Sequence, residues 1–371
     1  MSSKIAQKIK DIEDEIGRMQ IHKHSEHHYG MLKARLANLR QKQITEALRS
    51  QSSGGEGWEV QKAGSARVVM CGVPSAGKSS LLSKLTKTTS EVNARTFTTL
   101  TAIPGALEIN GTRIQLVDVP GITEKASENS GKGKRVISLT RTADLVLFVL
   151  EASKAAEQKR ILIHELGQMG IRINEQRPNV AVKRNNGNGL RVSITVDQTH
   201  GVDDKFIYNT LKLNDMLNAD VIISEDITHD QFIDCLYNNR VYIPAIFAIN
   251  KCDLVSIEAV DALARQPNTI PISVINNLGL DYLADAIYDR LNIVRIYTKK
   301  PQLLPDLRLT EAVILKGDKN TVRDLTSSLH KELLDKTAGA LVWGTSVKFP
   351  SQMCSMNHRL NDGDVVQLVM K

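Results

Sequence analysis

The sequence predicts an α/β protein with a mostly parallel central sheet, an N-terminal helical hairpin, an inserted α+β subdomain and a ubiquitin-like C-terminal module. Three observations lead to this class. Apolar residues recur every three or four positions before residue 50, short apolar strands alternate with amphipathic segments after residue 66, and strands surround a capped helix near the C-terminus. The 371 residues are enough for roughly two or three domains, each with its own core.

The N-terminal region contains two sets of apolar residues, each spaced so that it would line one face of a helix. The first is built from residues spaced three and four apart: Ile5, Ile9, Ile12, Ile16 and Met19. A second stripe, of leucines, follows an interruption at residues 22–30. Two stripes joined by a short polar break predict a helical hairpin, and the serine- and glycine-rich residues 50–57 predict a flexible linker. The hairpin and linker together make a first segment at residues 1–57.

The central domain is predicted from five apolar strand candidates, at residues 67–71, 113–117, 145–150, 243–249 and 270–274. The third and fourth are about a hundred residues apart, whereas a complete βαβ unit needs on the order of thirty. An α+β subdomain is therefore predicted at residues 169–240, between the two parts of the central domain at 65–168 and 241–295. The candidate elements of this insert are strands 191–196 and 220–224, helices 205–217 and 228–238, and a basic hairpin tip at 183–189.

A separate C-terminal module is predicted at residues 296–371. Thr321, with Asp324 three residues later, is the signal of a capped helix N-terminus. Trp343 lies in an apolar strand and is expected in the core of the module. The other predicted elements are strands 311–315, 340–344 and 365–370 and a turn at 316–320.

Composition and charge narrow the class of partner. No run of about eighteen uncharged apolar residues occurs, so neither a transmembrane helix nor a membrane partner is expected. The N-terminus carries charges where a signal peptide needs an apolar stretch, and the four cysteines are scattered singly, which favours a cytoplasmic protein with reduced thiols. The net charge of +7 favours polyanionic partners such as RNA without requiring one.

A phosphate-binding loop is predicted between the first strand of the central domain and a helix. The run Gly-Val-Pro-Ser-Ala-Gly-Lys-Ser matches the full pattern, in which backbone N–H groups face a phosphate at a positive helix N-terminus. Lys78 would supply a cation to the β- and γ-phosphates and act in catalysis, while the Ser79 hydroxyl is placed to ligate Mg²⁺. The predicted nucleotide contacts are Gly72, Val73, Pro74, Ser75, Ala76, Gly77, Lys78, Ser79 and Ser80.

Two further segments are predicted to reach the γ-phosphate and the metal. Asp118 and Gly121, in the run Asp-Val-Pro-Gly, fit a water-mediated Mg²⁺ contact and a γ-phosphate contact. The run Phe97-Thr98-Thr99 lies between the phosphate loop and Asp118, where a switch threonine closes on metal and phosphate. Thr99 is favoured as the catalytic and metal-binding threonine, and Thr98 stays open as an alternative. The predicted metal ligands are Ser79, Thr99 and Asp118.

Residues 250–253, Asn-Lys-Cys-Asp, follow an apolar strand and predict selection of the base. The Asp253 carboxylate can accept hydrogen bonds from guanine N1–H and its exocyclic amine, which adenine does not offer in that geometry. Lys251 can lie along the base, and Ser273 and Val274 are placed to close over guanine O6. The predicted nucleotide is therefore GTP or its product GDP rather than ATP. The predicted base-site residues are Asn250, Lys251, Asp253, Ser273 and Val274.

Longer strings match one family over nearly the whole chain. They are Phe97-Thr-Thr-Leu-Thr101, Asp118-Val-Pro-Gly-Ile122, Gly170-Ile-Arg-Ile-Asn174, Asn239-Arg-Val-Tyr-Ile-Pro244 and Val294-Arg-Ile-Tyr-Thr-Lys299. In these strings the chain resembles the developmentally regulated GTP-binding proteins, the DRG branch of the Obg-like GTPases of the TRAFAC class. The resemblance implies a P-loop GTPase G domain with the helical hairpin, the inserted subdomain and a C-terminal TGS domain. It also implies cytoplasmic work with ribosomes and RNA, a DRG-family regulatory partner protein, and Mg²⁺ as cofactor, with K⁺ stimulation as a further candidate.

The chain departs from the family pattern in both switch regions, at Ala94-Arg95-Thr96 and at Thr123-Glu-Lys-Ala126. Ile122 stands where many small GTPases have a glutamine that orients the attacking water, so slow intrinsic hydrolysis is expected. Arg95 is an alternative source of help, as an arginine supplied in cis. The leading hypothesis is a GTP-hydrolysing, ribosome-associated switch in translation. The alternative is a GTP-stabilised scaffold that binds RNA or the ribosome with negligible turnover.

Overall fold

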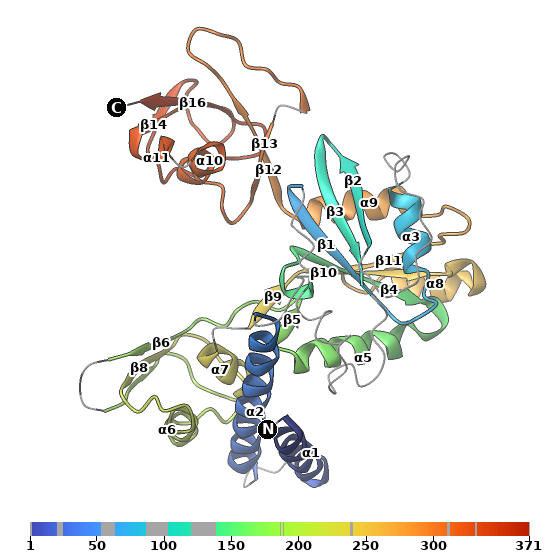
Figure 1. Ribbon diagram of the computed structural model, residues 1–371, viewed down its shortest axis with the longest axis vertical. Helices are drawn as coiled ribbons and strands as arrows, with labels where there is room; N and C mark the ends of the chain where they lie inside the picture. The colour runs from blue at the N-terminus through green and yellow to red at the C-terminus, as the bar shows by residue number, and fades with distance from the viewer. Residues whose placement is uncertain are drawn as a thin grey trace. The chain divides into compact units, whose positions relative to one another are not determined.

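The computed structural model describes residues 2–20, 25–52, 64–86, 103–119, 139–185, 187, 189–237, 240–309, 312–330 and 332–370. The chain divides into two compact units (Figure 1). The first comprises Met1–Glu59, Thr123–Arg141 and Arg160–Ile243, and the second comprises Val60–Ile122, Thr142–Lys159 and Pro244–Lys371.

A six-stranded sheet forms the centre of the second unit, with the strand order β11-β10-β4-β1-β3-β2 (Figure 1). Every neighbouring pair is parallel except β2 with β3, so the predicted mostly parallel sheet is confirmed. The strands are β1 (Ala66–Cys71), β2 (Ile103–Ile109), β3 (Thr112–Asp118), β4 (Leu145–Glu151), β10 (Ala245–Asn250) and β11 (Thr269–Pro271). The helical elements that follow these strands in the chain are α3 (Lys78–Leu85), η1 (Ala152–Lys154), α5 (Ala155–Gln168), η2 (Cys252–Leu254), α8 (Ile257–Ala264) and α9 (Leu280–Arg290).

The central strands are mostly apolar because both faces of the sheet are covered. All residues of β1 and β10 are buried, and so is every residue of β4 before its last. Phe148 of β4 stacks on Phe247 of β10 with ring centroids 5.1 Å apart. Leu81 of α3 and Leu283 and Ile287 of α9 are also fully buried in this core.

Three differences from the predicted strands coincide with prolines. The edge strand β2 is absent from the prediction, because Pro104 weakens the strand pattern; at an edge its missing N–H is tolerated. The predicted strand 243–249 is interrupted at Pro244, after which β10 begins. The predicted strand 270–274 is shorter than expected, since β11 ends at Pro271.

A five-stranded sheet with the order β13-β12-β16-β14-β15 forms the C-terminal part of the second unit. Its strands are β12 (Ile293–Thr298), β13 (Val313–Lys316), β14 (Thr337–Trp343), β15 (Gln352–Cys354) and β16 (Val365–Met370), and its helices are α10 (Val322–Leu329) and α11 (Leu333–Lys336). The predicted cap of α10 is confirmed: Thr321 accepts from the Asp324 amide, and the Asp324 side chain accepts from the Thr321 amide. β12 opens this sheet and begins before residue 296.

The expectation that Trp343 lies in the core of this module is wrong. Ala340 and Val342 of β14 belong to the buried cluster, whereas Trp343 is only half-buried. Successive strand residues point to opposite faces, so Trp343 lies on the face opposite to that of Val342. The Lys299 ammonium sits over its ring, 4.5 Å from the centroid.

The first unit begins with the predicted helical hairpin, formed by α1 (Ser2–Arg18) and α2 (Glu26–Ser52). Arg40 of α2 bonds Glu13 of α1 at 2.6 Å. The break between the helices is shorter than the predicted 22–30, and α2 continues into the predicted linker through Ser52. No helix in the described ranges is long and apolar enough to cross a membrane.

The α+β insert also belongs to the first unit. Its elements are β5 (Ile171–Ile173), β6 (Val180–Arg184), β7 (Arg191–Ile194), α6 (Asp204–Leu213), β8 (Ala219–Ile223), α7 (His229–Leu236) and β9 (Val241–Ile243). β8 lies between β6 and β7, antiparallel to the first and parallel to the second. The predicted hairpin tip at 183–189 is therefore wrong, since β6 and β7 are not paired and residues 185–190 connect two edge strands.

The hairpin and the insert share one core. Ala34 of α2 lies in the same buried cluster as Phe206 of α6 and Phe232 of α7. Gly30 lets the helices approach, since a Cβ there would lie 2.7 Å from Cδ2 of His229 and 2.9 Å from Cε2 of Phe206. The Lys33 ammonium bonds Asp230 at 2.5 Å, and this attraction helps to raise its pKa against the lowering by burial.

A buried ion cluster lies within the insert, at its first and last strands. Asp234 of α7 has a side chain only 3% exposed. Arg172 of β5 donates to both of its carboxylate oxygens, at 2.5 and 2.9 Å, and Arg240 before β9 lies 2.8 Å away. β5 and β9, the first and last strands of the insert, pair in parallel. The Asp234 carboxylate therefore links arginines from both ends of the insert.

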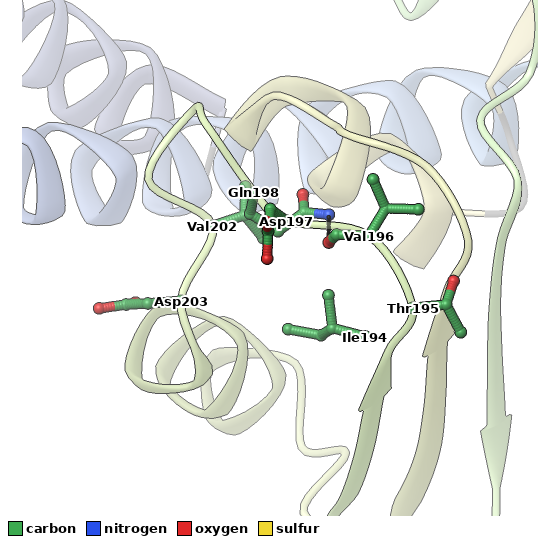
Figure 2. Close-up of a pocket in the computed structure, with 7 residues that line it drawn as sticks. All are labelled: Ile194, Thr195, Val196, Asp197, Gln198, Val202 and Asp203. Carbon is green, nitrogen blue, oxygen red and sulfur yellow. Dashed lines mark hydrogen bonds between the residues drawn. The ribbon is translucent and has the colours of Figure 1, made fainter.

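The insert contains an open hollow of about 420 Å³ (Figure 2). Figure 2 shows that its residues come from the end of β7 and from the loop that leads to α6. They are Ile194, Thr195, Val196, Asp197, Gln198, Val202 and Asp203. None of the residues predicted for nucleotide binding lines this hollow, so it is separate from the site described next.

Candidate nucleotide-binding site

The predicted site residues that the structure describes lie at the carboxyl ends of neighbouring strands. The phosphate loop follows β1, Asp118 ends β3, Asn250 ends β10 and Ser273 follows β11. Because these strands are parallel, their carboxyl ends meet at one edge of the sheet, where open α/β sheets bind ligands. Four of the predicted residues fall outside the described part of the chain: Phe97, Thr98, Thr99 and Gly121.

The phosphate loop has the backbone that its glycines allow. Ser75 and Gly77 have positive φ angles of 65° and 94°. At Gly72 a Cβ would lie 2.3 Å from the Val149 carbonyl oxygen of β4, and at Gly77 it would lie 2.4 Å from Asn250 Nδ2. Both positions therefore exclude a side chain, and the loop lies directly on the neighbouring strands.

Lys78 starts α3 and its side chain turns back across the loop. Its ammonium donates to the carbonyl oxygens of Gly72 and Val73, at 3.1 and 2.8 Å. Burial lowers the pKa of Lys78, and the nearby Asp118 carboxylate partly opposes this. The two carbonyls hold the ammonium at the mouth of the loop, where an incoming phosphate oxygen could replace them.

Ser79 and Asp118 form the part of the site that fits a metal. The Ser79 hydroxyl donates to Asp118 Oδ2 at 2.9 Å. Adjacent ligands around an octahedral Mg²⁺ are also about 2.9 Å apart, given metal–oxygen distances near 2.1 Å. Asp118 Oδ1 is buried and makes no hydrogen bond among the described residues, and burial raises the pKa of this carboxyl. An orphaned carboxylate oxygen beside a hydroxyl is a donor set suited to Mg²⁺, held directly or through water.

Asn250, the first residue of the base loop (residues 250–253), ties the phosphate loop to the loop after β11. Its Nδ2 donates to the Ala76 carbonyl oxygen at 2.9 Å, and its Oδ1 accepts from the Val274 amide at 3.1 Å. Asn250 is only 5% exposed. Because the Val274 amide is used here, Val274 fixes the loop after β11 in this structure, and its predicted contact with guanine O6 stays a prediction.

Two contacts position Asp253 and Lys251, the residues predicted to bind the base. Ser273 Oγ donates to Asp253 Oδ1 at 2.6 Å, and the second carboxylate oxygen is not used in this bond. Lys251 has a left-handed backbone with φ 63°, and its ammonium lies 3.1 Å from the carboxylate of Glu151. Glu151 is not among the sequence-predicted residues. The sequence signal that could have identified Glu151 is its position, as a charged residue directly after the buried apolar run of β4.

The chain is similar to known proteins over nearly its whole length. Residues 67–184 match the family described as 50S ribosome-binding GTPase, residues 187–293 match the C-terminal region of that domain, and residues 294–370 match the TGS domain. GTP-binding protein 1 of Schizosaccharomyces pombe and the developmentally-regulated GTP-binding protein 2 homolog of Dictyostelium discoideum are each 45% identical over 367 residues. The aligned region covers 99% of this chain and 99% and 100% of those proteins. Developmentally-regulated GTP-binding protein 2 of Homo sapiens is 42% identical, over 99% of this chain and 100% of its own length.

The sheet order, the phosphate loop and the base loop define a P-loop GTPase domain, followed by a C-terminal TGS domain. Identity above 40% over nearly the full length then gives the particular family. The chain belongs to the developmentally regulated GTP-binding proteins, and the resemblance seen in its sequence strings is confirmed.

Proposed function

We propose that this chain binds GTP and GDP at the edge of the six-stranded sheet and hydrolyses GTP with Mg²⁺. The observation that supports this most directly is the bridge made by Asn250. One buried side chain bonds both the phosphate loop and the loop after β11. A triphosphate group and its base can therefore be held by parts of the chain with a fixed mutual distance.

The triphosphate end is assigned to the phosphate loop. Its amides and Lys78 would bind the β- and γ-phosphates and stabilise the charge that develops during transfer. Ser79 and Asp118 would hold Mg²⁺, with Thr99 as the third proposed ligand. Bound Mg²⁺ would neutralise charge on the β- and γ-oxygens. Gly121 would donate its amide to the γ-phosphate. Further proposed contacts in these segments are Ser80, Phe97 and Thr98.

Base selection is assigned to Asp253. With one oxygen held by Ser273, the other can accept from guanine N1–H or the exocyclic amine. With adenine this oxygen would be left without a donor once the bound base covers it, which costs about 1–3 kcal/mol. Calorimetry with GTP and ATP tests this assignment: preference for GTP should be lost in Asp253→Asn, and a wild-type preference for ATP would overturn it.

Slow intrinsic hydrolysis is proposed because Ile122 cannot hydrogen-bond the attacking water. Mg²⁺-dependent phosphate release that Lys78→Ala abolishes would support an enzyme. Nucleotide binding with no phosphate release above the Lys78→Ala background would support the scaffold alternative instead. Arg95→Ala in single-turnover assays tests whether that arginine helps in cis, because an unchanged rate removes it from the mechanism.

The proposed cellular role is a ribosome-associated switch in translation, acting in the cytoplasm with a DRG-family regulatory protein, and with K⁺ as a candidate stimulator. The match to the 50S ribosome-binding GTPase family, the TGS domain and the net charge of +7 support an RNA-containing partner. A switch requires different affinity in its two states. Ribosome co-sedimentation should therefore be stronger with a non-hydrolysable GTP analogue than with GDP, and equal sedimentation at several salt concentrations would contradict it.

A further inference from the structure

Among the described residues, Glu151 contacts the base site through its ion pair with Lys251. Its carboxylate lies 3.1 Å from the ammonium of Lys251, and the two side chains are 27% and 29% exposed, respectively. Lys251 is the residue expected to lie along the purine. Glu151 is therefore one residue removed from the nucleotide, and it meets the lysine at its charged end.

The backbone fixes both ends of this ion pair. Glu151 ends β4 directly opposite Asn250, which ends β10. The Glu151 amide donates to Oε1 of Gln158 at 3.0 Å, and Gln158 is only 8% exposed. On the other side, Lys251 leaves its strand in a left-handed conformation with φ 63°. Glu151 thus lies at a strand end and Lys251 directly follows one, so less conformational freedom is lost when the pair forms.

We propose that Glu151 is a positioning residue for guanine-nucleotide binding. It holds the Lys251 ammonium, so that the hydrocarbon stem of the lysine covers one face of the base while the charge stays paired at the rim. Without the carboxylate, the lysine is free to turn into solvent and has to be ordered when the nucleotide binds. This inference rests on the proposed function, because it assigns a role within the same site.

The position of the pair determines which measurements it affects. Glu151 lies on the base side, so it should change GTP and GDP affinity by the same factor. It does not reach the γ-phosphate through Lys251, so turnover at saturating GTP should not change. A purely structural role at the end of β4 would instead lower the thermal stability of the nucleotide-free protein and would act independently of Lys251.

The test is a double-mutant cycle in the full chain, with Glu151→Gln, Lys251→Ala and the double variant. Binding of fluorescent GDP and of a fluorescent non-hydrolysable GTP analogue is measured, together with kcat and the melting temperature without nucleotide. The matched control is Glu157→Ala, an exposed carboxylate in the first turn of α5. Glu151→Gln should weaken both nucleotides about two- to fivefold, the range expected of a partly exposed ion pair. The kcat should be unchanged, and no further loss should appear in the Lys251→Ala background.

Two results would overturn the proposal. One is a Glu151→Gln variant that binds both nucleotides as tightly as the wild type and the Glu157→Ala control do. The other is an equal loss with and without Lys251, which means that Glu151 acts through the sheet and not through the lysine. Failure of the proposed function gives a different result, because the wild-type chain would then show no preference for GTP over ATP. That result would overturn both the proposed function and the role of Glu151.

Discussion

Replacing Asn250 with alanine is the sharpest perturbation of this site. The change removes the bond to the Ala76 carbonyl and the bond from the Val274 amide, at 2.9 and 3.1 Å. Ala76 is 0% exposed and Val274 is 4% exposed, so neither backbone group can readily turn to water. A buried polar group without a partner costs about 1–3 kcal/mol, which gives about 2–6 kcal/mol for the two.

This cost should appear partly as lost stability and partly as lost affinity. The phosphate loop and the loop after β11 would no longer be joined, and nucleotide binding would have to order them. If about 1.4 kcal/mol of the cost falls on the binding step, the affinity for GDP falls about tenfold. Hydrogen exchange should also become faster at the Val274 amide, because its acceptor is gone.

The assays are fluorescent GDP binding, urea unfolding without nucleotide, and hydrogen exchange of the two loops. Asn250→Asp keeps an acceptor for the Val274 amide but sets a carboxylate against the Ala76 carbonyl, so it should also bind GDP weakly. Asn276→Ala is the matched control; its described bond uses the backbone amide, and its effect should stay within about 0.5 kcal/mol. Wild-type affinity and exchange in Asn250→Ala would refute the bridging argument.

Three further predictions concern the first unit. Asp234→Asn should destabilise the first unit by about 3–5 kcal/mol in urea unfolding, because two partly or fully buried arginines lose their carboxylate. As a control, Asp261→Asn breaks an exposed ion pair in the second unit and should cost under about 1 kcal/mol. Equal destabilisation by the two variants would contradict the prediction. Gly30→Ala should cost about 1–3 kcal/mol by overpacking the shared core, whereas Gly17→Ala, with nothing near its added methyl group, should stabilise α1 by up to about 1 kcal/mol; the opposite order of melting temperatures would show that the core has room. Burial raises the pKa of the Cys235 thiol to about 11 from its ordinary value of 9.0. The neutral thiol therefore contributes fully to the free energy of unfolding below pH 9, and this contribution is lost as the pH rises from 9 to about 11. Urea unfolding across this range should show a loss in the wild type that is smaller in Cys235→Ala, and identical pH profiles would remove this thiol as the cause.

Local signals in the sequence were sufficient to place the phosphate loop between β1 and α3. Lys78 and Ser79 follow glycines at fixed spacing between an apolar strand and a helix, and all of these elements are described where they were expected. The capped start of α10 at Thr321 was likewise readable, because a cap depends on neighbours within one turn. Strand ends were less predictable where a proline removes a backbone donor, as at Pro244.

Long-range contacts could not be predicted from local sequence signals. Trp343 lies in an apolar strand, but which face of a strand is buried depends on the strands beside it. The pairing of β8 between β6 and β7 follows from sheet assembly and not from the residues that connect the edge strands. Glu151 follows a buried apolar run in the sequence, but its pairing with Lys251 becomes visible only once β4 and β10 end side by side.

The sequence by itself determined the fold class, the family and the position of the phosphate loop, because each depends on residue types at short, fixed spacings. The tertiary structure alone decided that Asn250 joins the phosphate loop to the loop after β11, that Glu151 pairs with Lys251, and that the helical hairpin shares its core with the insert. These contacts join segments far apart in the chain. They form only when packing of the whole unit brings the segments together.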